Sequence, residues 1–208
     1  MNHLLLLVDL QNEYFPGGNM ELVGIEDASA HAQILLQEFR NARLPIIHVK
    51  HISADPGATS FLPETDGAAI HQVVAPKDNE IVVQKNYPNS FRETTLLEML
   101  KAETIRNLVI CGAMSHMCID ATTRAAFDLG FDCVVAEDAC ATRDLVFKST
   151  TIKASDVHAS FMAALSAAYA TVISTQEIIE SMKRDPAPGP LGPQSRSRAR
   201  SATSPENA

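Results

Sequence analysis

Three residues of types that can carry out acid, base and nucleophilic chemistry stand where apolar runs end. Asp9, Lys85 and Cys118 each close or follow a run of apolar residues of the kind that forms a buried strand. In an open α/β sheet, the carboxyl ends of parallel strands meet at one edge, and ligands bind there. The three side chains are therefore candidates for a single site.

Cys118 is the candidate nucleophile of the three. The apolar run 108–111 is followed by a turn and then by apolar residues at spacings of three and four, which predicts a strand, a turn and a helix. Cys118 falls in the first helical turn, where unpaired N–H groups and the helix dipole favour a thiolate. The alternative is that Cys118 packs as a small apolar residue, the interpretation preferred for Cys111, Cys133 and Cys140.

Strand and helix patterns alternate along the chain, which predicts a parallel sheet covered by helices on both faces. Strands are expected at 4–10, 46–49, 81–84, 108–111, 132–139 and 171–174, and helices at 28–42, 94–101, 116–129, 154–168 and 176–183. The first and third strands are expected to be buried. Residues 50–79 form a long connection, which is interpreted as a loop that covers the site.

Length and composition indicate one globular domain. The 208 residues are 46% hydrophobic, and we expect a domain over 1–184 followed by a disordered tail over 185–208, which is rich in Pro, Gly, Ser and Arg. The four cysteines form no C-x-x-C pair, and the amino terminus lacks the features of a signal peptide. A reduced, cytoplasmic environment is therefore expected.

Charge and spacing argue against several classes of partner. A formal net charge of −8 disfavours nucleic acid, and the apolar run near the amino terminus is too short to cross a membrane. His48, His51, Asp55 and His71 match no compact metal-binding spacing, so neither a metal nor another cofactor is expected. A small-molecule substrate is the expected partner.

Three motifs, in this order, resemble the isochorismatase-like cysteine hydrolases, a superfamily that includes nicotinamidases and N-carbamoylsarcosine amidohydrolase. They are Leu-Val-Asp9-Leu-Gln11-Asn-Glu-Tyr14-Phe15, Lys85-x-x-x-x-Ser90-Phe91 and Gly112-Ala113-Met114-Ser115-x-x-Cys118-Ile-Asp120-x-Thr122-x-Arg124-x-Ala126. The likeness covers about 3–183. It implies a Rossmann-like, three-layer α/β/α sandwich with a six-stranded parallel sheet, and a homo-oligomer, either a dimer or a tetramer.

The resemblance also implies roles for individual residues. The catalytic triad of the family maps onto Asp9, Lys85 and Cys118, and its non-proline cis peptide bond maps onto Ala113–Met114. The N–H groups of Met114 and Cys118 would then form an oxyanion hole. Ordinary core packing is the alternative for the apolar members of the expected substrate-binding set, which consists of Gln11, Phe15, Tyr87, Phe91, Met114 and Phe147.

This chain departs from two branches of the family. Nicotinamidases carry an Asp-x-His metal motif after the second strand, where this chain has His48-Val49-Lys50-His51-Ile52. The difference argues against a metal and against nicotinamide as the substrate. Isochorismatases proper lack the nucleophilic cysteine, so the presence of Cys118 argues against hydrolysis of a vinyl ether.

Together these residues predict hydrolysis of an amide-type C–N bond. Asp9 would take the thiol proton and later give it to the leaving amine, while Lys85 stabilises the thiolate. Attack by Cys118 on a carbonyl gives an oxyanion, which backbone donors stabilise by about 3 kcal/mol each. Water then hydrolyses the acyl thioester.

Other functions remain as alternatives. They are an isochorismatase-type or other non-amide hydrolase, a redox-active thiol protein and a non-catalytic binding protein. A second catalytic arrangement would use His116 as the base of a Cys-His dyad, but side chains two residues apart on a helix point away from each other. The identity of the substrate depends on the loops 50–79 and 140–150, which no motif interprets.

Overall fold

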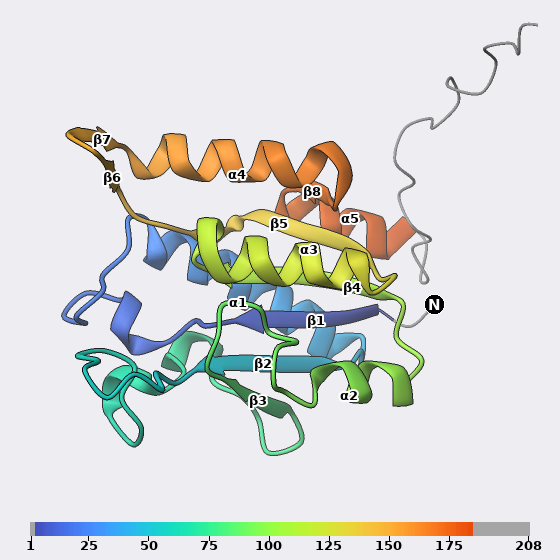
Figure 1. Ribbon diagram of the computed structural model, residues 1–208. Coiled ribbons are helices and arrows are strands. Elements are labelled where there is room, and N and C mark those ends of the chain that lie inside the picture. Colours follow the sequence, from blue (N-terminus) through green and yellow to red (C-terminus); the bar gives the residue numbers. More distant parts are fainter. Residues whose placement is uncertain (1–2, 185–208) are drawn as a thin grey trace, which may run out of the picture.

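The computed structural model describes residues 3–184, and its main element is a parallel sheet of six strands (Figure 1). The strand order is β3-β2-β1-β4-β5-β8, which is the 3-2-1-4-5-6 order of Rossmann-like folds. The strands are β1 (His3–Val8), β2 (Ile46–His51), β3 (Ile81–Lys85), β4 (Asn107–Ala113), β5 (Asp132–Ala141) and β8 (Thr171–Ile173). The predicted parallel α/β sheet is confirmed.

Five α-helices cover the two faces of this sheet in the described part of the chain. Alternate side chains of β1 face opposite layers: Leu5 and Leu7 pack in one core cluster, and Leu4 and Leu6 pack in the other. Helices α1 (Ile25–Asn41) and α5 (Thr175–Arg184) lie over the first cluster, and α2 (Leu96–Ala102), α3 (Asp120–Asp128) and α4 (Ala154–Ala168) lie over the second (Figure 1). The three-layer sandwich is therefore confirmed.

Several short elements have no counterpart in the sequence predictions. A hairpin of β6 (Leu145–Phe147) and β7 (Thr150–Ile152) precedes α4, and short helical turns η1 (Asn12–Tyr14), η2 (Asp66–Ala68) and η3 (Gln72–Val74) lie in the loops. Elements of three residues are too short to show a hydrophobic period, which is why the sequence did not reveal them.

The expectation of a buried third strand is wrong. β3 is an edge strand with β2 as its neighbour, and Ile81 and Val82 are 42% and 41% exposed. Its apolar residues resemble those of a central strand, but an edge strand of a covered sheet is open on one side.

Two further expectations concern the carboxyl-terminal tail and membrane-spanning segments. The predicted disordered tail, 185–208, lies outside the described residues. Within the described part, no helix is both long enough and apolar enough to cross a membrane.

Glu80, just before β3, ties the connection between β2 and β3 to its neighbours. Its carboxylate accepts hydrogen bonds from Arg40 at 2.7 and 2.8 Å and lies 2.9 Å from Nε2 of His48. Burial alone would raise the pKa of Glu80, but hydrogen bonds from Arg40, from the backbone N–H of Lys77 and from His48 lower it from 4.5 to about 2. His48 thus takes part in a hydrogen-bonded contact with Glu80.

We predict that Glu80→Gln lowers the free energy of unfolding by about 2 kcal/mol near pH 7, because it removes a charged hydrogen-bond acceptor from Arg40. A lowered folded-state pKa stabilises the protein above pH 4.5 and loses that effect as the pH falls toward about 2. Urea unfolding should therefore show the difference from wild type shrinking by about 1 kcal/mol at pH 4. A difference that grew on acidification would contradict this account.

Gly112 allows β1 and β4 to approach each other closely just before the predicted site. It pairs with Val8, has a φ of 126°, and a Cβ at this position would overlap the carbonyl oxygen of Val8. Gly130 also has a positive φ, 89°, but its Cβ would meet no atom within 4 Å.

We predict that Gly112→Ala lowers the free energy of unfolding by at least about 3 kcal/mol, because the two strands must separate. Gly130→Ala is the matched control and should cost about 1 kcal/mol, the cost of the backbone conformation alone. Chemical denaturation of both variants measures the difference. Equal losses would show that the contact with Val8 is unimportant.

Candidate active site

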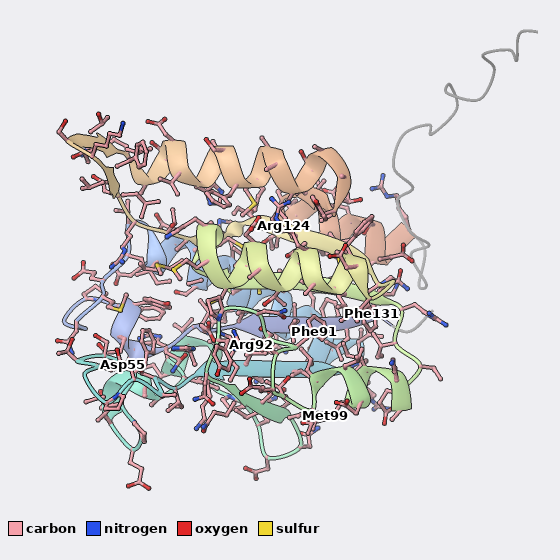
Figure 2. All side chains as sticks on the ribbon, viewed as in Figure 1. Asp55, Phe91, Arg92, Met99, Arg124 and Phe131 are labelled. Carbon is pink, nitrogen blue, oxygen red and sulfur yellow. The ribbon has the colours of Figure 1, made fainter. Side chains whose placement is uncertain are left out.

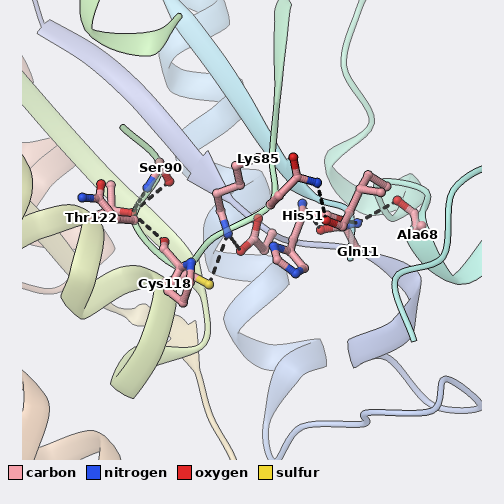
Figure 3. Close-up of polar contacts among 12 residues, drawn as sticks. Gln11, His51, Ala68, Lys85, Ser90, Cys118 and Thr122 are labelled. Carbon is pink, nitrogen blue, oxygen red and sulfur yellow. Dashed lines mark hydrogen bonds and ion pairs between the residues drawn. The ribbon is translucent and has the colours of Figure 1, made fainter. Parts of the chain in front are cut away.

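Asp9, Lys85 and Cys118 lie together at the carboxyl ends of β1, β3 and β4. Nζ of Lys85 is 2.6 Å from Oδ2 of Asp9 and 3.3 Å from Sγ of Cys118. Figure 3 shows the contact between Lys85 and Cys118. The exposed fractions are 0% for Asp9, 1% for Lys85 and 6% for Cys118. The ammonium group therefore bridges a carboxylate and a thiol that are both removed from bulk water.

The order of the strands explains this meeting. The chain passes from β1 outward through β2 to β3, and then crosses back to place β4 on the other side of β1. Such a reversal opens a crevice at the carboxyl ends of the two strands on either side of it. Asp9 follows β1 and Cys118 follows β4, so both residues lie where such folds place a ligand, and Lys85 extends to them from the edge strand.

The turn that carries Cys118 differs from the predicted start of a regular α-helix. Residues Ser115–Ile119 form one π-helical turn before α3, and the N–H groups of Met117 and Ile119 both donate to the carbonyl of Met114. Such turns are frequent at functional sites. The peptide bond Ala113–Met114 is cis, as the family resemblance implied. The oxyanion-hole role of the Met114 and Cys118 N–H groups stays a prediction.

The electrostatics of the site favour a neutral thiol. Burial raises the pKa of Cys118, and the charge of Asp9 raises it further, while Lys85 opposes both effects. Burial lowers the pKa of Lys85, but the charges of Asp9 and Cys118 and the hydrogen bonds to them together outweigh burial, so the net shift is upward. The Lys85–Asp9 ion pair therefore lies against a thiol whose pKa is raised, and the thiolate expected from the sequence stays a prediction.

The other three cysteines are also buried and free. Burial is the main cause that raises the pKa of Cys133 and of Cys140 to about 12 and that raises the pKa of Cys111. Among the four, the side chain of Cys118 is the one in contact with Lys85.

Tyr14 and His51 also border the triad. The sequence analysis assigned a catalytic or substrate-binding role to neither of them. Burial raises the pKa of Tyr14, as do the charges of Asp9 and Cys118. His51 ends β2 in register with Lys85, and burial followed by the charge of Lys85 lowers its pKa. Its position at the end of a strand was the signal that could have identified His51, as it identified Asp9.

Phe61 lies in the connection between β2 and β3, and its ring packs against the rings of Tyr14 and His51. Its ring meets Tyr14 edge-on at 5.0 Å and His51 edge-on at 5.4 Å. Phe61 itself is 5% exposed. The long connection therefore does reach the site, as predicted, through a buried aromatic side chain.

Gln11 has a different role from the expected contact with substrate. Its Nε2 donates to the carbonyls of His51 and Ala68 at 2.8 and 2.7 Å, and its Oε1 accepts from the N–H of His51 at 2.7 Å (Figure 3). Because these bonds occupy the amide group, Gln11 joins the end of β1 to β2 and to η2 instead of facing a ligand.

Three aromatic residues expected in the pocket are engaged elsewhere. Phe91 stacks on Phe131 with ring centroids 6.1 Å apart on the α2 and α3 side of the sheet (Figure 2). The guanidinium of Arg92 covers the ring of Tyr87 at 3.5 Å. Phe147 is 67% exposed on the β6–β7 hairpin. The structure of the single chain therefore does not support these three as pocket walls.

The remaining two expected pocket residues are buried. Phe15 stacks on His71 at 3.6 Å and lines a cavity of about 840 Å³ between the segments 12–19 and 59–75. The lining of this cavity does not include the triad. Met114 is 3% exposed and packs in the core cluster that lies under α1.

His116, the base of the alternative dyad, is engaged with other groups. Its Nδ1 lies 2.6 Å from Oγ1 of Thr142, and its ring meets Phe161 edge-on. This geometry agrees with the argument from its spacing to Cys118. Within 3–184, no group of three or more His, Cys, Asp or Glu side chains is arranged to hold a metal ion.

Comparison with known proteins identifies the family to which the chain is similar. Residues 3–177 match the family model described as the isochorismatase domain. The uncharacterised isochorismatase family protein YddQ of Bacillus subtilis is 46% identical over 180 residues, which cover 86% of this chain and 100% of that protein. A ureidoacrylate amidohydrolase of Azorhizobium caulinodans is 27% identical over 168 residues, covering 65% of this chain and 74% of that protein.

A solved structure is similar to this chain in both sequence and fold. The crystal structure of an Oleispira antarctica protein assigned as an isochorismatase hydrolase has a TM-score of 0.83 and 52% identity, covering 86% of this chain and 96% of that chain. A family match over most of the chain, together with a relative of this identity, leaves no other assignment. The protein belongs to the isochorismatase-like hydrolase family.

Proposed function

We propose that this protein is a cysteine hydrolase that cleaves an amide-type C–N bond of a small molecule through an acyl thioester on Cys118. The observation that carries the proposal is the buried contact of Lys85 with both Asp9 and Cys118, at 2.6 and 3.3 Å. Membership of a hydrolase family supports it, and one relative is named as an amidohydrolase.

Because the pKa of the Cys118 thiol is raised, the first step needs a base. Asp9 accepts the thiol proton while the sulfur attacks the carbonyl carbon, and the ammonium of Lys85 stabilises the negative charge that forms on sulfur. Collapse of the tetrahedral intermediate breaks the C–N bond, and the leaving amine takes the proton from Asp9. Water, deprotonated by Asp9, then attacks the thioester and restores the thiol.

The alternatives have less support. Oxidation of cysteine requires a thiolate, whereas the pKa of Cys118 is raised. Hydrolysis of another bond type would use the same triad, but a nucleophile, a base and a cation in contact are the groups that acyl transfer needs. We also propose that the substrate is a small molecule and that the protein is a homo-oligomer.

We predict that the purified protein releases ammonia from members of a panel of small primary amides and N-carbamoyl compounds. Cys118→Ala and Lys85→Met should each lower turnover by at least about 100-fold. Lys85→Met should also raise the thiol pKa of Cys118, because Asp9 is left without its cation, and the rate of iodoacetamide alkylation against pH measures that shift.

His116→Ala is the matched control for this experiment. Because His116 is engaged with Thr142, the substitution should change turnover by less than about tenfold and leave the alkylation profile in place. Thermal unfolding of Lys85→Met checks that the variant is folded. Ammonia release from wild type no faster than from Cys118→Ala would reject amide hydrolysis, and an effect confined to His116→Ala would indicate a Cys-His dyad.

A further inference from the structure

The π-helical turn that carries Cys118 is tied to β5 and to α4 by the side chain of its first residue. Oγ of Ser115 lies 2.9 Å from Nδ1 of His158, on α4, and 3.3 Å from the carbonyl oxygen of Ala141, on β5. Ser115 is 0% exposed, so bulk water does not compete for its hydroxyl. Helix α4 also contacts α3, which continues from this turn (Figure 1). His158 therefore meets the turn from an element far along the chain.

A neutral His158 with its proton on Nε2 accounts for this contact. Glu137 of β5 lies 4.0 Å from Nε2, and its carboxylate favours a proton on that nitrogen. Burial lowers the pKa of His158 and the charge of Glu137 opposes burial, with a net downward shift, so the ring is neutral at neutral pH. Nδ1 is then the bare nitrogen, and it accepts the hydroxyl proton of Ser115 in the shorter of the two contacts.

This bond bears on catalysis through the place of Ser115 in the chain. Ser115 follows Met114 and lies three residues before Cys118, so it belongs to the segment that carries the sulfur and the predicted oxyanion donors. A shift of the turn would move these groups relative to Lys85, which Asp9 holds in place. Misplacement of reacting groups by about 1 Å can lower a rate by about 100-fold.

We propose that His158 is a positioning residue, whose Nδ1 holds the hydroxyl of Ser115 and thereby fixes the turn that presents Cys118 to the substrate. The proposal rests on the proposed function, since it takes Cys118 as the nucleophile. Glu137 has a supporting part, because it keeps the proton of the ring on Nε2 and leaves Nδ1 bare. His158 acts through Ser115 and needs no contact with the substrate.

Three substitutions of His158 test this role. Asn carries its amide at about the distance of Nδ1 from the backbone and can still accept from Ser115, Gln carries its amide one bond farther out, near the place of Nε2, and Leu has no polar group. Turnover is measured on the small amide that wild type hydrolyses fastest. His158→Leu and His158→Gln should lower kcat by about 10- to 100-fold with KM within about threefold of wild type, whereas His158→Asn should keep kcat within about threefold.

A merely structural role of His158 predicts the opposite order of the two amides. Gln is a better helix former than Asn, so a residue that only supports α4 would tolerate His158→Gln better than His158→Asn. Thermal unfolding checks that each variant is folded. His31→Leu is the matched control, because His31 also lies on a helix, 3.5 Å from an acidic residue of β5, Asp138, and this variant should keep the wild-type kcat and KM.

A double-variant cycle tests whether the effect passes through Ser115. Ser115→Ala removes the hydroxyl at the other end of the bond and should lower kcat in the same range as His158→Leu. Because the two side chains act as one unit, the double variant should lose no more than the worse single variant. Losses that multiply would show that the two residues act independently, and would overturn the proposal.

Alkylation of Cys118 by iodoacetamide, followed by peptide mass spectrometry, tests the same role without turnover. Asp9 raises the pKa of the thiol and Lys85 lowers it, so a displaced sulfur in His158→Leu should move the midpoint of the alkylation rate against pH by at least about half a unit. His158→Asn should keep the wild-type midpoint. This order of midpoints, without ammonia release by wild type, would support His158 as a positioning residue and reject amide hydrolysis.

Four results would overturn the proposal. They are an unchanged kcat in His158→Leu, a kcat in His158→Gln at least as high as in His158→Asn, a loss confined to KM, and, if wild type shows no turnover, the same alkylation midpoint in all variants.

Discussion

The ion pair between Lys85 and Asp9 is the interaction on which the site depends. Burying two charges costs several kcal/mol per ion, and their attraction offsets that cost only when they are in close contact, as they are at 2.6 Å. Removing either partner would leave an uncompensated charge in a dry site. The pair also sets the chemistry of Cys118, because Asp9 disfavours the thiolate and at the same time offers a base for its proton. A buried ion pair adds little to the free energy of unfolding. Its main effect here is to hold Asp9 and Lys85 in a defined position beside Cys118.

The rest of the fold can be understood as the means of holding this pair in place. The reversal of strand order places β4 beside β1, and Gly112 allows β4 to lie against β1 immediately before the turn that carries Cys118. On the other side, Gln11 and Glu80 fix the two ends of the connection between β2 and β3. That connection returns Phe61 to the site, where it packs against Tyr14 and His51.

The sequence allowed the triad to be predicted because each member follows an apolar run, and the ends of parallel strands must share an edge. The parallel sheet with helices on both faces followed from the alternation of patterns, and its six strands and three layers followed from the family motifs, whereas the order of the strands was not predicted. Side-chain direction in loops could not be predicted. Gln11 and Phe91 stand within the family motifs, yet the amide of Gln11 is occupied by backbone groups and Phe91 packs on Phe131. Phe147 lies on a hairpin too short to give a periodic signal, and the exposure of β3 depends on its position at the edge of the sheet among residues 3–184.

The most direct test of the account is a titration of the Cys118 thiol in Asp9→Asn, followed by thiolate absorbance with Cys118→Ala as the blank. Asp9→Asn removes the charge that raises the thiol pKa and leaves Lys85 unpaired, so the titration midpoint should move to lower pH than in wild type. Turnover of the same sample should nevertheless fall by at least about 100-fold, because the thiolate gains population while the base that later protonates the leaving amine is lost. A midpoint at higher pH, or turnover within tenfold of wild type, would contradict the role assigned to Asp9.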